Sequence, residues 1–278
     1  MFIDKLSLRN PSVARFIIHH TRGEVARFSL YIDEVTPGNA LRPGLGRQYM
    51  SCYWTLLDLP SWFRSSQWGW FYLMFIEARQ LKRIPDGIGA VVASLIEKFW
   101  DPSGWDMARL GVRMSVGQDT WAVVKISLAC FIADEKALKE LSSAKGASAR
   151  KPCIRCANIV GRVDEGADLG DYLLHYSSTN YQGFDLWSSV RLAEAAAVIQ
   201  EAHRSGVPNR LVKDLERRLG LSYGAGQGIL FRPAAIVAQI PDTLFWDSMH
   251  TVYAIGGVAQ YECNQYAQEI IGLGISRG

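Results

Sequence analysis

Cysteine is scarce in this sequence, and the five residues present do not form the set of a disulfide-stapled protein. Small secreted domains that depend on disulfides carry an even and dense set of cysteines. Here the number is odd, and only Cys153 and Cys156 lie close together along the chain. The cysteine content therefore excludes a disulfide framework and favours a reducing compartment.

Long apolar runs and an apolar leader are also missing. The longest strongly apolar stretch, residues 68–76, is about half of the roughly 20 residues that a membrane-spanning helix needs. The first residues include Asp4 and Lys5 and lack the apolar region of a signal peptide. We therefore expect a soluble protein of the nucleus or cytoplasm, neither secreted nor bound to a membrane.

An excess of one charge sign is the third missing feature. The chain has 30 Lys and Arg residues and 27 Asp and Glu residues, which gives a net charge of +3 at pH 7. This value neither indicates nor excludes nucleic acid, because a basic patch can lie within a nearly neutral total. Hydrophobic residues make up 49% of the 278 residues. That content suits one large α/β domain with an insertion.

The residue pattern predicts strands that alternate with helices. Segments 26–35 and 48–57 are rich in β-forming residues and run into turn-forming ones, so they are expected to form a hairpin. Segment 68–76 fits either a third strand or the start of a helix. The other expected elements are a helix at 88–100, strands at 111–116 and 120–133, a helix at 136–141, two helices within 191–219 and a helix at 258–271. The almost continuously apolar segment 120–133 is expected to be a central strand covered on both faces.

Two aspartates end predicted strands. Asp33 closes the first strand, and Asp134 follows the apolar segment 120–133. Carboxylates at the ends of neighbouring central strands can share divalent cations, which prefer hard oxygen ligands and assist attack on phosphate. Each residue also has a purely structural interpretation, since Asp33 fits a turn and Asp134 fits the N-cap of the following helix.

Cys153 and Cys156 have the spacing of half a tetrahedral zinc site, because two intervening residues let both thiolates reach one ion. No second C-x-x-C occurs in the sequence, so histidines would have to supply the missing ligands, with His175 and His250 as candidates. An ordinary reduced pair and a redox motif are the alternatives.

The segment DSMH places Asp247 and His250 three residues apart, on one face only if the segment is helical. Its structural alternative is a helix-capping aspartate with a partly buried histidine. The glycine-rich segment 220–228 lacks the Lys-Ser/Thr ending of an NTPase phosphate loop, so that function is not expected.

In their order along the chain, these motifs resemble the catalytic domain of eukaryotic cut-and-paste DNA transposases, particularly the CACTA-like and related superfamilies. That family has a first Asp at the end of strand one, a second Asp after the fourth strand, a C-x-x-C soon after it and a D-x-x-H farther on. The matching positions, within roughly residues 25–265, are Asp33, Asp134, Cys153, Cys156, Asp247 and His250.

The resemblance implies an α/β fold: an RNase H-like mixed sheet with flanking helices and a helical insertion at about 185–235, in a single core over residues 1–278. It implies metal-dependent phosphoryl transfer on DNA, with cleavage and joining at the element ends. Asp33 and Asp134 would hold two Mg²⁺ or Mn²⁺ ions that activate first water and then the DNA 3′-hydroxyl. Asp247 would belong to the catalytic set, and His250 would lie beside the scissile phosphate.

The resemblance also leaves three points open. The cysteine pair would hold zinc in an incomplete site, and further copies of the chain are a candidate partner besides DNA. The family's late catalytic Glu lies well beyond the D-x-x-H, whereas here only Glu262 and Glu269 follow, both close to the motif. We therefore expect a transposase-derived chain whose core is incomplete at its C-terminal end and which lacks robust strand transfer.

The alternatives are a non-catalytic DNA- or protein-binding module of the same fold, and an enzyme of unrelated α/β fold with Asp33 and Asp134 far apart.

Overall fold

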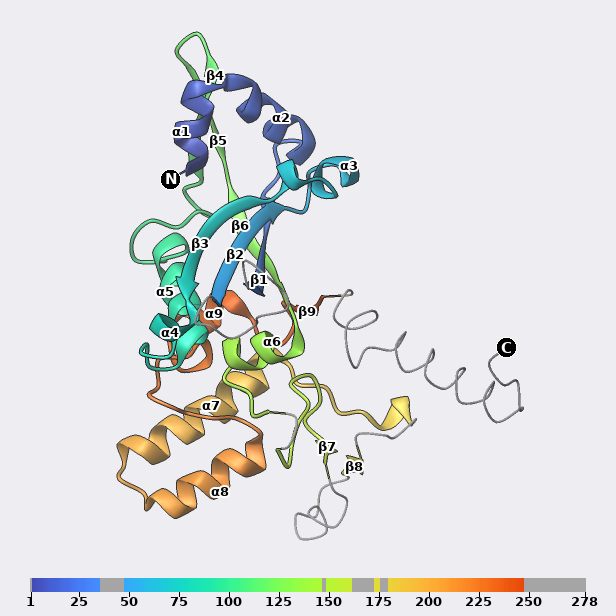
Figure 1. Cartoon of the computed structure of the whole chain (residues 1–278), viewed down its shortest axis with the longest axis vertical. Helices are drawn as coiled ribbons and strands as arrows, with labels where there is room; N and C mark the ends of the chain where they lie inside the picture. The colour runs from blue at the N-terminus through green and yellow to red at the C-terminus, as the bar shows by residue number, and fades with distance from the viewer. Residues whose placement is uncertain (1, 36–47, 147–148, 162–172, 176–179, 248–278) are drawn as a thin grey trace, which may run out of the picture.

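The computed structural model describes residues 2–35, 48–146, 149–161, 173–175 and 180–247 (Figure 1). Strands and helices alternate along the chain, so the predicted α/β class is confirmed. The helices are α1 (Phe2–Arg9), α2 (Pro11–Thr21), α3 (Ser61–Arg64), α4 (Ala78–Leu81), α5 (Gly87–Phe99), α6 (Glu135–Leu141), α7 (Ser189–Arg204), α8 (Asn209–Leu219) and α9 (Ala234–Ala238), with short 3₁₀ turns η1 (Gln67–Gly69), η3 (Tyr181–Gly183) and η4 (Ile229–Phe231). The strands are β1 (Ala26–Val35), β2 (Tyr49–Leu56), β3 (Phe71–Glu77), β4 (Val112–Gly117), β5 (Thr120–Val124), β6 (Ile126–Ala133), β7 (Ile159–Val160), β8 (Leu174–His175) and β9 (Leu244–Trp246).

A mixed sheet in the order β3-β2-β1-β6-β9 forms the centre of the molecule. Strand β2 runs antiparallel to both β1 and β3, whereas β6 runs parallel to β1 and β9 runs parallel to β6. The predicted β1–β2 hairpin is confirmed, and the ambiguous aromatic segment contains strand β3 followed directly by α4. The carboxyl ends of β1, β3, β6 and β9 consequently lie at one edge of the sheet.

The prediction of one central strand over 120–133 is wrong, because the segment divides at Lys125. Residues 120–124 form β5, whose one pairing partner among the described strands is β4 in a separate hairpin, and residues 126–133 form the central strand β6. Gln118 and Asp119 both adopt a positive φ at the hairpin turn, a conformation that two-residue hairpin loops require. Helices α1 and α2, which were not predicted, pack against this hairpin, where Ser115 N donates to Ser7 Oγ at 3.0 Å.

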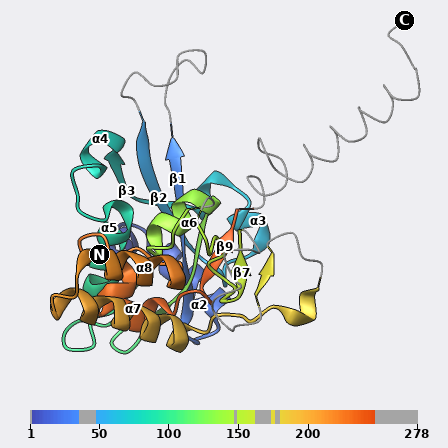
Figure 2. The same ribbon diagram turned by 90° about the horizontal axis from the view of Figure 1, so that it is seen from below.

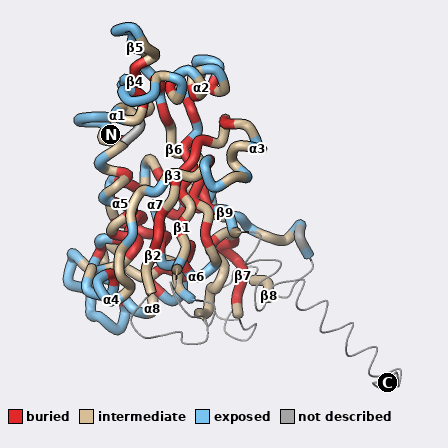
Figure 3. The backbone as a smooth tube through the Cα atoms, turned by 45° about the horizontal axis from the view of Figure 1, so that its top comes forward, coloured by how far each residue is buried: buried red, intermediate tan, exposed pale blue. Residues whose placement is uncertain are grey.

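The main core lies on the face of the sheet that carries Phe28, Leu30 and Ile32, all buried. Helix α5 packs on this face, and Trp100 at its end donates from Nε1 to Ile126 O at 2.8 Å. Helices α5, α6, α7 and α8 gather on one side of strands β1, β2 and β3 in Figure 2. Buried backbone follows the central strands, and exposed backbone marks the tip of the β4–β5 hairpin (Figure 3).

The two helices expected within 191–219 are present as α7 and α8. Both lie below the sheet in Figure 1 and pack against each other. Glu216 on α8 is fully buried and pairs with Lys213 at 2.9 Å and with Lys145 at 3.4 Å. Among the described residues, no helix combines the length and the apolar character needed to cross a bilayer.

The glycine-rich segment 220–228 holds the carboxylate of Asp86, at the start of α5. Asp86 accepts backbone hydrogen bonds from Ala225 N at 2.8 Å, Gln227 N at 2.6 Å and Gly228 N at 3.2 Å. A methyl group on Gly224, whose φ is +58°, would lie 2.0 Å from Asp86 Oδ1. The glycines therefore serve a close contact within the fold.

We expect Asp86→Ala to lower the free energy of unfolding by about 2 kcal/mol, because three N–H donors lose a charged acceptor. Asp86→Asn is the matched control, since asparagine tolerates the left-handed φ of 59° at this position and keeps one side-chain acceptor. Urea unfolding of both variants measures the difference. Equal midpoints for Asp86→Ala and the native protein would show that the segment is held by other contacts.

Candidate functional site

Three aspartates lie in one row at the carboxyl edge of the central sheet. Ile32 is in register with Ala133, and Ala133 is in register with Trp246. The next residue along the chain is Asp33 within β1, Asp134 directly after β6 and Asp247 directly after β9, and Asp247 N donates to Ala133 O at 2.9 Å. Neighbouring parallel strands lie about 4.8 Å apart, and residues of one row face the same side of the sheet. We call Asp33, Asp134 and Asp247 the aspartate row.

The side chain of Tyr31 interacts with all three carboxylates of the aspartate row. It precedes Asp33 by two residues on β1, and its hydroxyl donates to Asp247 Oδ2 at 2.9 Å. Burial raises the pKa of Tyr31, the hydrogen bond to Asp247 raises it further, and the charges of Asp33, Asp247 and Asp134 add to the effect. All three carboxylates therefore act on one phenol, as expected for side chains grouped on one face.

A pocket of about 280 Å³ opens beside the row, with Asp33 and Asp134 in its wall. Glu34 and Glu140 contribute two more carboxylates, and Lys136, which lies 3.9 Å from Glu34, contributes one positive charge. A pocket with this excess of negative charge attracts cations.

Asp134 has a structural role as well, because its Oδ1 accepts a hydrogen bond of 2.6 Å from Ala137 N and so caps α6. The predicted helix cap is therefore confirmed. A carboxylate has two oxygens with several lone pairs, so capping through Oδ1 leaves Oδ2 for a cation. Across the described residues, no three His, Cys, Asp or Glu side chains are grouped closely enough to hold one metal ion. A shared ion would require the aspartate side chains to turn towards one another.

The predicted placement of Asp33 and Asp134 on neighbouring strands is confirmed, whereas their proposed catalytic role stays a prediction. His250 lies outside the described residues, and so do Glu262, Glu269 and the helix predicted at 258–271. Tyr31 was missed by the sequence reasoning. Its signal was available, because a residue two positions before Asp33 on a strand lies on the same face.

Cys153 and Cys156 interact through a hydrogen bond between their side chains. The hydrogen bond from the Cys156 thiol lowers the pKa of Cys153 to about 6, while burial opposes the shift. Donating that hydrogen bond and being buried both raise the pKa of Cys156. One thiolate next to one thiol suits a metal ligand pair and a reactive dithiol equally.

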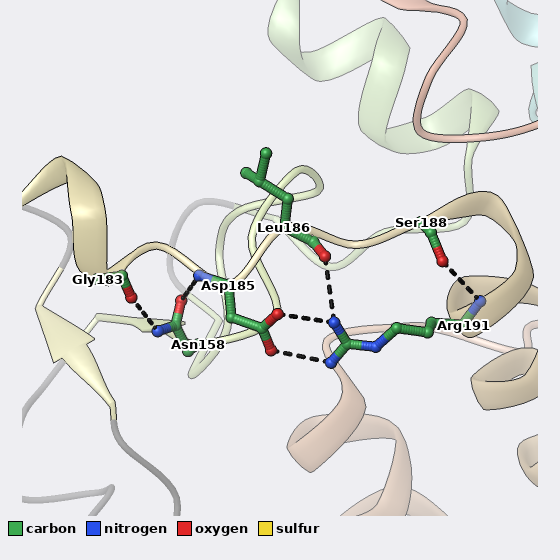
Figure 4. A network of polar contacts seen from close by, with 6 residues as sticks. All are labelled: Asn158, Gly183, Asp185, Leu186, Ser188 and Arg191. Carbon is green, nitrogen blue, oxygen red and sulfur yellow. Dashed lines mark hydrogen bonds and ion pairs between the residues drawn. The ribbon is translucent and has the colours of Figure 1, made fainter.

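The segment that follows the helical turn η3 is hydrogen-bonded to Asn158, two residues after Cys156 (Figure 4). Cys156 and Leu186 form an isolated antiparallel bridge. Asp185 accepts two hydrogen bonds from Arg191, at 2.7 and 2.9 Å, and its backbone N–H donates to Asn158 Oδ1 at 2.9 Å. The beginning of α7 is thereby tied to the residues that follow the cysteine pair.

His175, one candidate for completing the zinc site, lies on β8 in register with Val160. Its Nε2 is 3.1 Å from Gly161 O. Within the described part of the chain, His175 does not join the two cysteines in a metal-binding group. The zinc site therefore stays a prediction, and its other candidate ligand, His250, falls outside the described residues.

We expect Cys153 to react with iodoacetamide faster than Cys156 at pH 7, because the thiolate is the nucleophile and Cys153 has the lower pKa. The alkylation rate of Cys153 should rise with a midpoint near pH 6. In Cys156→Ala the hydrogen bond is lost, so the midpoint should move towards about 8.5. Mass spectrometry of the alkylated peptides identifies the modified residue, and an unchanged midpoint in Cys156→Ala would contradict the assignment.

Comparison with known protein families finds none whose model matches this chain, and comparison with curated proteins finds no similar sequence.

Proposed function

We propose that this protein is a transposase-derived, RNase H-like phosphoryl transferase that cleaves DNA with the help of divalent cations. The observation that carries the proposal is the register of the sheet, which places Asp33, Asp134 and Asp247 in one row at the ends of three parallel strands. The five-stranded mixed sheet, in which β2 alone runs antiparallel to the other strands, is compatible with the proposed RNase H-like core.

The donor set fits Mg²⁺ or Mn²⁺, since both ions prefer carboxylate oxygens. Asp33 and Asp134 would hold the ions, with Glu34 and Glu140 adding negative charge in the same pocket. Bound divalent ions would supply activation of the attacking hydroxyl and neutralise charge on the phosphate. Asp247 accepts a hydrogen bond from the Tyr31 hydroxyl, and this bond fixes the orientation of the Asp247 carboxylate.

The experiment is a cleavage assay on supercoiled and linear DNA with Mg²⁺, Mn²⁺ or EDTA, followed by titration of Mn²⁺ into the protein. We expect nicking in either metal, none in EDTA, and Mn²⁺ binding that Asp33→Asn weakens. Cleavage that persists in EDTA would contradict the proposal. Metal-independent DNA binding without any cleavage would favour the non-catalytic binding module.

A further inference from the structure

An aromatic patch lies next to the aspartate row on the same face of the sheet. Tyr31 is in register with Tyr53, and Tyr53 is in register with Tyr72, so the three rings cross β1, β2 and β3 in one line. Their ring centroids are 6.5 and 5.8 Å apart. Phe75 continues the series, 6.1 Å from Tyr72 and 4.8 Å from Tyr49. We call Tyr31, Tyr49, Tyr53, Tyr72 and Phe75 the aromatic patch.

The aromatic patch touches the candidate site directly. Ser51 is in register with Asp33 on one side and with Phe75 on the other, so Phe75 lies at the end of the aspartate row. Tyr31 belongs to the patch and also donates to Asp247. A chain-like ligand bound on the aromatic patch would therefore place its adjoining segment next to the carboxylates of the aspartate row.

The outer rings of the patch are open to solvent. Tyr72 is 53% exposed and Phe75 is 56% exposed, both on the edge strand β3. Exposed aromatic residues in contact with one another are costly to leave in water, and such patches mark binding surfaces. Packing in the hydrophobic core does not explain these exposed rings, because the main core lies on the opposite face of the sheet.

Three basic residues follow β3 directly along the chain, at the end of the sheet where the aspartate row lies. Strand β3 ends at Glu77 and is followed by Arg79, Lys82 and Arg83, all exposed. Arg79 pairs with Glu77 at 2.5 Å, whereas Lys82 and Arg83 have no acidic partner among the described residues. Basic residues beside stacked aromatic rings suit a polyanion whose flat groups can lie on the rings.

From these observations we propose that the aromatic patch binds unpaired nucleotides of a nucleic-acid strand and delivers the adjoining phosphate to the aspartate row. This inference deepens the proposed function and rests on it. Bases stack on aromatic rings only when the face of the base is free, so the patch selects single-stranded segments or frayed ends over intact duplex. Lys82 and Arg83 would neutralise phosphates of the strand bound on the aromatic patch.

The test is fluorescence anisotropy of a short labelled oligothymidylate in EDTA, which separates binding from cleavage. We expect the native protein to bind it at least about tenfold more tightly than a duplex of equal length, because duplex bases hide their faces. Tyr72→Ala and Phe75→Ala should each weaken binding by about tenfold, while Tyr72→Phe keeps the ring and should bind like the native protein. Trp62→Ala is the matched control, because Trp62 is 67% exposed and its ring contacts are with Phe16 and Phe63, outside the patch.

The salt dependence gives an independent readout of the basic residues. Replacing Lys82 and Arg83 together by Ala should lower the slope of log affinity against log salt by about 1.4, since each phosphate contact of a single strand contributes about 0.7. Affinities of Tyr72→Ala and Phe75→Ala within about twofold of the native value would overturn the proposal. A change from dimer to monomer in these variants, with unchanged oligonucleotide binding, would also overturn it and assign the patch to self-association.

Failure of this inference can be told apart from failure of the proposed function. Binding in EDTA that depends on the aromatic patch, without cleavage in Mg²⁺ or Mn²⁺, would support nucleotide binding by the patch and contradict the proposed catalytic function. Cleavage that requires Asp134 but is equally fast in Phe75→Ala would support the proposed catalytic function and contradict nucleotide binding by the aromatic patch.

Discussion

Asp134→Asn is expected to reduce metal-dependent DNA cleavage by about 10³-fold or more, while the free energy of unfolding stays near the native value. The catalytic loss follows from removing a negative charge from the pocket that would hold the cations. The stability is kept because asparagine caps helices about as well as aspartate, and its side-chain oxygen can still accept from Ala137 N. The measurement is the initial rate of plasmid nicking in Mg²⁺ and in Mn²⁺, with urea unfolding of the same samples.

Glu135→Gln is the matched control for this variant. Glu135 is the next residue, its side chain is 59% exposed, and it pairs with Lys139 one turn along α6. Lys139 is buried, with only 7% of its side chain exposed, and the amide oxygen of glutamine can still accept a hydrogen bond from it. Nicking should therefore stay close to native, while the free energy of unfolding falls by about 1 kcal/mol because the buried lysine loses a charged partner. If Asp134→Asn and Glu135→Gln nick DNA equally well, the aspartate row has no catalytic role.

The positions of Asp33 and Asp134 were accessible from the sequence for a definite reason. Both follow strands with strong β-forming patterns, and both precede residues that break the strand, so each strand end could be located. The position of Asp247 beside them was implied by the family resemblance alone and not by the local residue pattern. Strand β9 has three residues, Leu244–Trp246, and a segment so short carries no readable periodicity.

The misassigned segment 120–133 shows a second limit. Apolar composition alone cannot show where a chain passes from a projecting hairpin into a central strand, since Val123 is 60% exposed on β5 and Phe131 is fully buried on β6. The missed helix α2 differs, because Asn10 followed by Pro11 is a readable helix start, and Asn10 does cap it through Ser12 N. The glycine-rich segment 220–228 could not be explained from its own residues, as its partner Asp86 lies 139 residues before Ala225.

Phe131→Ala should lower the free energy of unfolding by about 4 kcal/mol, through lost apolar burial and the cavity left behind. Phe131 is fully buried on β6, in register with Leu30 on β1 and with Leu244 on β9. Its backbone N–H donates to Thr243 O at 2.8 Å, so it also fixes the entry to β9. Urea unfolding followed by circular dichroism measures the loss.

The effect should reach the aspartate row, because in the described part of the chain the short strand β9 pairs with β6 as its one neighbouring strand, from Phe131–Leu244 to Ala133–Trp246. Loosening that pairing would displace Asp247 from Asp33 and Asp134, so Mn²⁺ binding should weaken in Phe131→Ala even under conditions where the variant remains folded. Phe245→Ala tests the same strand from the opposite face. Phe245 is 52% exposed and in register with Ile132, so its removal leaves no cavity and should cost well under 1 kcal/mol. Similar losses of stability in both variants would mean that the side chain of Phe131 is not packed in the hydrophobic core.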